Sequence, residues 1–140
     1  MEAQYALVCD WANSTETGKL NVMGEFDIIW AEVFPAVHLT MFFCAKVLLS
    51  AGDPDEVAFE LRVVGEDGQL ATNPVGIRGR RNAPPTDGEL ATLRLVIQVN
   101  AAQFREPGTY SFELHAGPTR LASADLHVKQ LVKPNPPAPS

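Results

Sequence analysis

Hydrophobic and polar residues alternate with a period of two along most of this chain. The clearest alternating segments are residues 57–64, 93–100, 110–115 and 122–129. This alternation is typical of β-strands that have one face in the core and the other in water. Turns between such segments are predicted by clusters of Gly, Pro and Asp at 51–55, 65–68, 106–108 and 117–118.

The pattern predicts an all-β protein with eight strands. We expect these strands at residues 4–11, 19–25, 37–49, 57–65, 69–78, 91–99, 109–116 and 119–128. Many short strands with regular turns favour a single-domain antiparallel β-sandwich, immunoglobulin-like or a related Greek key. Pro74 lacks a ladder donor, so the fifth strand is expected at a sheet edge. The sandwich domain is assigned to residues 1–130, and the Pro-rich tail 131–140 is expected to be disordered.

Composition narrows the function classes. The chain has 140 residues and a formal net charge of −6. This charge argues against a nucleic-acid partner or an anionic membrane surface, because both need clustered Lys and Arg. The N-terminal residues lack the pattern of a signal peptide, so we expect a cytoplasmic protein. Cys9 and Cys44 are then expected to be reduced residues of the core.

Several sequence blocks are distinctive. They are ALVCDWA, GKLNVMGEFDIIWAEVFP, an EDG turn and a closing PGTYSFEL hairpin. Together they resemble a family of small bacterial proteins that is catalogued only as a domain of unknown function. The similarity runs from about Ala6 to Val128, and its most specific part lies between Gly18 and Pro35. The resemblance implies a β-sandwich and transfers no catalytic residue.

The apolar segment GEFDIIWAEVFP, residues 24–35, has three possible roles. In the leading interpretation, Ile28, Trp30 or Phe34 closes the open end of the sandwich. A lip that binds a partner is the alternative. Membrane contact is disfavoured because Asp27 and Glu32 interrupt the segment and it carries no cation.

The predicted strand 37–49 is apolar on one face and only partly polar on the other. Such a strand needs cover on both faces. The cover would come from segment 26–36, from loop 79–90 or from another chain, since apolar patches often mark interfaces. Self-association or binding to another protein is therefore the main functional expectation. The interface candidates are Phe42, Cys44, Leu48, Trp30 and Phe34.

Signals for catalysis are weak. His38, His115 and His127 have no metal-ligand spacing, and the two cysteines do not form a CxxC motif. The sequence also lacks a GxSxG elbow and a phosphate-binding loop. We therefore expect a non-enzymatic protein without a cofactor.

Alternating strand directions would bring loops 12–18, 50–56, 79–90 and 117–119 to one end of the sandwich. Candidate Ca²⁺ ligands at that end are Asp53, Asp55, Glu56 and Asp87. The candidates for recognition by loop residues are Arg78, Arg80 and Arg81, which would also compete with a metal as counter-ions. A sandwich that binds a small ligand, Ca²⁺ or a carbohydrate is thus the alternative function, with Trp11 and Trp30 as the possible sugar platforms.

Overall fold

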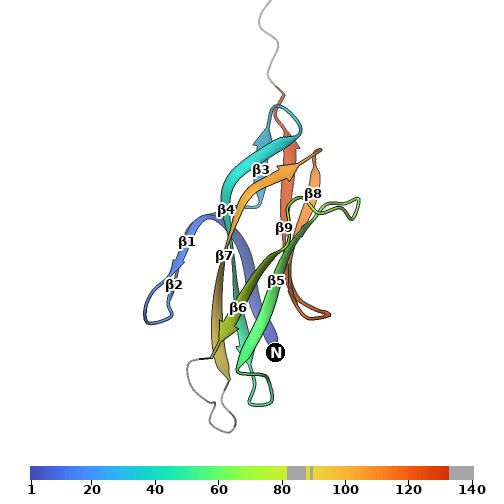
Figure 1. Ribbon diagram of the computed structural model, residues 1–140. Coiled ribbons are helices and arrows are strands. Elements are labelled where there is room, and N and C mark those ends of the chain that lie inside the picture. Colours follow the sequence, from blue (N-terminus) through green and yellow to red (C-terminus); the bar gives the residue numbers. More distant parts are fainter. Residues whose placement is uncertain (82–87, 89, 133–140) are drawn as a thin grey trace, which may run out of the picture.

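The computed structural model describes residues 1–81, 88 and 90–132 and shows two packed β-sheets (Figure 1). The strands within this part of the chain are β1 (Glu2–Ser14), β2 (Leu20–Glu25), β3 (Ile28–Ala31), β4 (Ala36–Leu49), β5 (Glu56–Val64), β6 (Val75–Arg80), β7 (Ala91–Phe104), β8 (Gly108–Ala116) and β9 (Thr119–Gln130).

One sheet has four strands in the order β2-β1-β4-β7, and the other has five in the order β3-β9-β8-β5-β6. The predicted all-β sandwich is therefore confirmed. The strands of the four-stranded sheet pair antiparallel throughout. The five-stranded sheet contains one parallel pair, in which Ile28 of β3 lies beside His127 of β9.

Each of the eight predicted strands has a counterpart, but two details of the prediction were wrong. The segment 69–78 becomes a strand only from Val75, after an isolated bridge between Val64 and Leu70. Its strand β6 does lie at a sheet edge, as Pro74 indicated. Strand β3 was missed because its four residues are too few to show a period. Of the tail predicted at 131–140, residues 133–140 lie outside the described part of the chain, whereas Leu131 is bonded to Ala31.

The main core lies between the sheets and is built from the inward positions of the long strands. Its largest fully buried side chains include Phe43, Phe104 and Phe112. The rings of Phe43 and Phe112 stack with centroids 6.5 Å apart, and this contact joins the two sheets. At one end the sheets approach closely, because a Cβ added to Gly79 of β6 would lie 3.0 Å from the side chain of Leu93 on β7.

A smaller second core lies on the outer face of the four-stranded sheet. It contains Cys9, Ala12 and Cys44, all buried, and half-buried apolar residues pack around them. The β1–β2 hairpin covers this core by bending back over the sheet. Arg94 of β7, the opposite edge strand, donates a hydrogen bond to the carbonyl oxygen of Gly18 at the hairpin tip, 3.4 Å away. Among the described residues, the hairpin thus gives the cover of the second core, which the sequence did not suggest. Most of loop 79–90 lies outside the described part of the chain.

Candidate functional site

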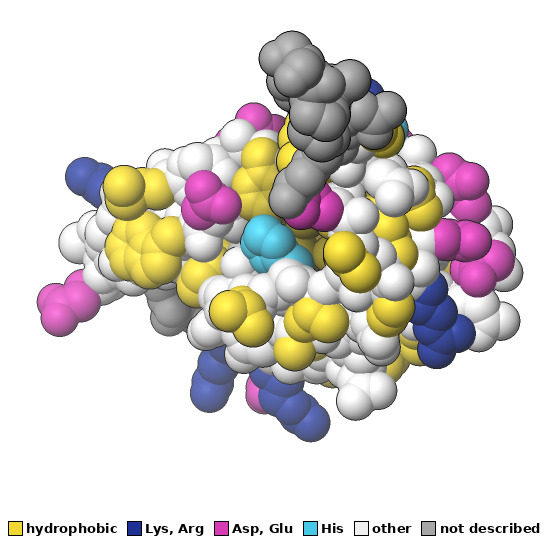
Figure 2. Space-filling view, turned by 90° about the horizontal axis from the view of Figure 1, so that it is seen from above, with side chains coloured by type: hydrophobic (Ala, Val, Ile, Leu, Met, Phe, Trp, Pro, Cys, Tyr) yellow, Lys and Arg dark blue, Asp and Glu magenta, His cyan; other side chains and the backbone are white. Residues whose placement is uncertain are grey.

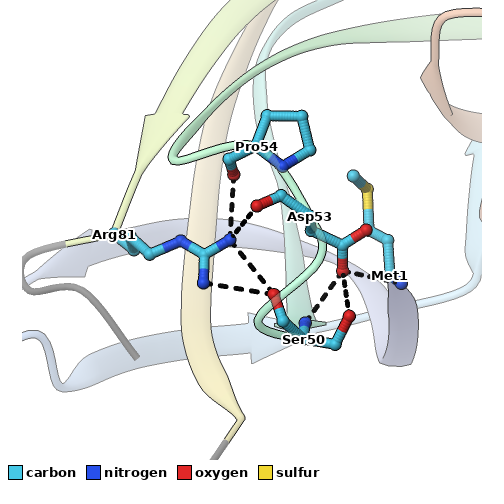
Figure 3. A network of polar contacts seen from close by, with 5 residues as sticks. All are labelled: Met1, Ser50, Asp53, Pro54 and Arg81. Carbon is cyan, nitrogen blue, oxygen red and sulfur yellow. Dashed lines mark hydrogen bonds and ion pairs between the residues drawn. The ribbon is translucent and has the colours of Figure 1, made fainter. Parts of the chain in front are cut away.

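Of the loops expected at one end, the β4–β5 turn lies with the end of β6 at the lower end of Figure 1, whereas the tip of the β1–β2 hairpin projects to the side. Residues 82–87 and 89 of loop 79–90 lie outside the described part of the chain. Arg81 follows directly after β6 and is 5% exposed. Its guanidinium donates hydrogen bonds to the backbone oxygens of Ser50, Asp53 and Pro54 (Figure 3). Its Nε also lies 3.1 Å from a carboxylate oxygen of Asp55. Arg81 therefore ties the β4–β5 turn to the end of β6 and is not accessible to a partner.

Two further acidic residues near Arg81, Asp53 and Glu56, have polar partners of their own. The Asp53 carboxylate accepts hydrogen bonds from the backbone nitrogen and hydroxyl of Ser50 and lies 2.9 Å from the Met1 ammonium group. The bond from this ammonium group is the main cause that lowers the pKa of Asp53. Glu56 pairs with Arg78 at 3.3 Å.

The calcium hypothesis gains no support from this geometry. Within residues 1–81, 88 and 90–132, no group of three or more His, Cys, Asp or Glu side chains is placed to hold a metal ion. Asp87 lies outside the described residues. Of the three arginines proposed for recognition, Arg78 and Arg80 are exposed on the edge strand β6.

The five interface candidates occupy different environments. Cys44 is fully buried in the second core, so it offers no surface for a partner. Phe42 and Leu48 are half-buried on the outer face of β4. Phe34 packs against the main core, in agreement with the plug interpretation. Trp30 does not act as a plug, since it is 58% exposed.

Trp30 borders an open hollow of about 420 Å³ at the opposite end of the sandwich from Arg81, and we call it the Trp30 hollow. Strand β3 supplies part of its wall, and the rest comes from β1, β4 and the short connection between β2 and β3. The lining residues are Asp10, Phe26, Ile28, Ile29, Trp30 and His38.

The local backbone explains how these side chains meet. Gly24 has a positive φ of 69°, and a Cβ there would lie 2.5 Å from a carboxylate oxygen of Asp10. Glycine therefore lets the Asp10 side chain lie across β2. The backbone nitrogen of Phe26 then donates to the oxygen of Val8, 3.0 Å away, and holds the start of the next segment against β1.

Two contacts of aromatic rings fix the walls of the hollow. The rings of Phe26 and His38 lie 6.1 Å apart at a tilt of 44°. The Lys129 ammonium group lies 5.5 Å from the centre of the Trp30 ring, a cation–π contact between β9 and β3. The indole is thus held in place although most of its surface is open to water.

The segment that carries Trp30 has further exposed apolar side chains. Val33, Val37 and Leu39 are 74%, 54% and 79% exposed. With Ile28 and Trp30 they form what we call the apolar rim, which belongs entirely to the segment 28–39. Figure 2 looks onto this end of the molecule and shows hydrophobic side chains around a histidine.

A second hollow, of about 500 Å³, lies between the tip of the β1–β2 hairpin and the outer face of the four-stranded sheet. Its floor includes Tyr5 and Leu7, and two cations, Lys19 and Arg94, stand at its wall. Arg94 is already bonded to the hairpin tip, so this hollow is partly closed by the contact that covers the second core.

Only weak signs of a nucleophile–base arrangement are present. The Thr109 hydroxyl lies 3.1 Å from Nδ1 of His127, which is its partner in the β8–β9 ladder. Among the described residues, no carboxylate is hydrogen-bonded to the His127 ring. His115 is paired with Glu113 at 3.0 Å and lies opposite Arg120 in the β8–β9 ladder.

Comparison with known proteins adds the family. Residues 4–129 match the model of a family of unknown function (DUF6941). The chain belongs to this family. The match extends over nearly all of the sandwich, in agreement with the resemblance seen in the sequence. No curated protein matches the chain. Within the described residues, no helix has the length and apolar character needed to cross a membrane.

Asp10, Phe26 and His38 were not grouped by the sequence. They lie on separate parts of the chain, and only the fold around β2 and β3 brings them to one hollow. The available signal was Gly24, two positions before the aromatic Phe26. It indicated a bend in the chain but not which residues the bend would bring together.

Proposed function

We propose that this protein is a non-enzymatic β-sandwich that acts by binding another protein chain through the apolar rim and the Trp30 hollow. The observation that carries this proposal is the exposure of Trp30, 58%, beside a hollow with two further aromatic rings. Tryptophan is enriched among the residues that dominate the binding energy of interfaces.

The arrangement of the rim supports binding of a protein. Contiguous exposed apolar side chains are unfavourable in water and commonly mark interaction sites. The rim is also held on a firm support, because Trp30 contacts Lys129 and because Phe34 packs against the main core. A rigid aromatic anchor loses little conformational entropy when a partner covers it.

We also propose that the protein works in the cytoplasm. Cys9 and Cys44 are both unpaired, with their Sγ atoms 4.0 Å apart. Two close thiols that remain reduced are compatible with a reducing compartment.

The proposal is tested by measuring solution mass with light scattering across a concentration series. We expect the wild-type protein to associate, and Trp30→Ser to weaken this association about tenfold or more. Trp11→Ser is the matched control, since Trp11 is 44% exposed but does not line the hollow. A wild-type monomer at every concentration, with no partner retained by a Trp30-dependent pull-down, would contradict the proposal.

A small-molecule site is the second candidate, because the volume of the Trp30 hollow falls within the range of ligand pockets. Its two ring walls and the Asp10 carboxylate suit a carbohydrate, which stacks on an aromatic face and donates hydroxyl hydrogen bonds. Tryptophan fluorescence during titration with mono- and oligosaccharides tests this candidate. A change that is lost in Trp30→Ser but kept in Trp11→Ser would favour it.

A further inference from the structure

The C-terminal sequence VKPNPPAPS, residues 132–140, has a composition suited to an aromatic site. It contains four prolines and a single charged side chain, Lys133. Proline-rich peptides bind as polyproline II helices in grooves lined by aromatic rings. This helix has three residues per turn, so Lys133, Pro136 and Pro139 would share one of its faces.

The Trp30 hollow offers the complementary chemistry. The rings of Trp30, Phe26 and His38 line it and can pack against pyrrolidine rings. The Asp10 carboxylate, which also lines it, is opposite in charge to Lys133. The hollow is therefore complementary to the peptide both in its apolar surface and in its charge.

The path of β9 indicates which copy the peptide would reach. The backbone nitrogen of Leu131 donates to the oxygen of Ala31, 2.8 Å away, so the chain leaves the sheet beside the end of β3. Because β3 and β9 are parallel, the chain there moves away from Ile28, and the hollow lies behind it. To reach its own hollow, the chain would have to turn back. The hollow of a second copy facing this end requires no reversal.

We propose that residues 132–140 of one copy bind in the Trp30 hollow of a second copy. This inference rests on the proposed function and identifies the binding partner as a second copy of the same chain. Each chain leaves its sheet close to its own hollow, so a two-fold arrangement that brings two hollows together would allow both segments to exchange at once. Nine residues in a polyproline II helix extend about 28 Å, which is sufficient to pass from one hollow to the other across such an interface.

The experiment uses a protein that ends at Val132 and a synthetic peptide of residues 132–140. The substitution Trp11→Phe leaves Trp30 as the single tryptophan, because the chain has two. We expect the peptide to change the Trp30 fluorescence with a saturable curve. We also expect the truncated protein to associate at least about tenfold more weakly than the full chain.

Matched variants separate the contacts. A peptide with Pro136→Ala and Pro139→Ala should bind about tenfold more weakly. A peptide with Lys133→Glu should bind the protein about threefold more weakly. This loss of affinity should be smaller when the protein carries Asp10→Asn. Trp30→Ala, read by light scattering and by calorimetry with the peptide, should abolish binding, whereas Trp11→Ala should leave it unchanged.

The possible results distinguish this inference from the proposed function. If the truncated protein still associates in a Trp30-dependent manner and does not bind the peptide, the inference is wrong and the proposed function stands. If the truncated protein binds the peptide but the full chain is monomeric and does not, the segment occupies its own hollow, and the second-copy proposal is overturned. If Trp30→Ala affects neither association nor peptide binding, both proposals fail.

Discussion

The Sγ atoms of Cys9 and Cys44 lie 4.0 Å apart beneath the β1–β2 hairpin. Both side chains are fully buried. Desolvation by burial raises the pKa of both thiols, that of Cys44 to about 12. The hairpin thus keeps both groups protonated and away from solvent at neutral pH.

We predict that neither thiol reacts with a disulfide reagent at pH 8 in the native protein, because reaction requires an exposed thiolate. Both should react at once in denaturant. The measurement is the absorbance released by the reagent with and without urea. Rapid reaction of one equivalent in the native protein would show that the hairpin does not cover the second core.

The same burial predicts a loss of stability at alkaline pH. The folded pKa of Cys44 is raised, so the thiol is neutral in both states below about 9 and carries no penalty there. As pH rises from about 9 toward 12, the unfolded chain ionises first, and the free energy of unfolding should fall. Urea denaturation of the wild type and Cys44→Ala across this range tests the prediction, since the fall should be smaller in the variant.

We predict that Arg81→Met destabilises the fold by about 3 kcal/mol, because it leaves three part-buried carbonyl oxygens without the donor that joins them. Those oxygens belong to Ser50, Asp53 and Pro54. Arg80→Met is the control, because Arg80 is exposed on β6 and should cost little. Equal effects of the two substitutions on urea midpoints would contradict the assigned role of Arg81.

Asp53 gives a prediction at acidic pH. Its folded pKa is lowered, chiefly by the Met1 ammonium group, from a usual value of 3.8. Its stabilising contribution is therefore present above about 3.8 and is lost as pH falls through the lowered folded pKa. Asp53→Asn should be less stable than the wild type at pH 7, and this difference should shrink toward pH 2. A constant difference in unfolding free energy across that range would argue against the ion pair.

We predict that Gly24→Ala costs about 2 kcal/mol, from the strained positive φ and from the contact with Asp10. The substitution should also weaken the binding of any ligand in the Trp30 hollow, because the Asp10 side chain must move away from the added Cβ. Gly52→Ala should be nearly neutral, since nothing lies within 4 Å of the added atom. Thermal melts of both variants, with the peptide titration as second readout, check this prediction.

The long strands could be predicted because each one buries a single face, and burial of alternate residues leaves a clear period. Strand β5 is an example, with buried Val57, Phe59, Leu61 and Val63. Strand β3 left no such trace, because four residues with both exposed and half-buried apolar side chains resemble a loop. Its parallel pairing with β9 depends on a distant part of the chain and has no local signal.

The candidate site was only partly predictable. Trp30 was recognised as a candidate for partner binding, but its neighbours Asp10 and His38 are brought to it by the bend of β2 at Gly24. The sequence also did not distinguish the roles of Arg78, Arg80 and Arg81. Three arginines within four positions look alike in sequence, whereas only Arg81 meets the carbonyl oxygens of the β4–β5 turn.

The pairing of β3 with β9 has a consequence for biosynthesis. Ile28 finds its ladder partner in His127, in the last strand of the domain. During translation the apolar segment around β3 must therefore wait, unpaired, until almost the whole sandwich has left the ribosome. Such distant pairing slows folding. During this interval, only local contacts hold the residues around Trp30. Strand β9 then completes the sheet and fixes the shape of the proposed binding site.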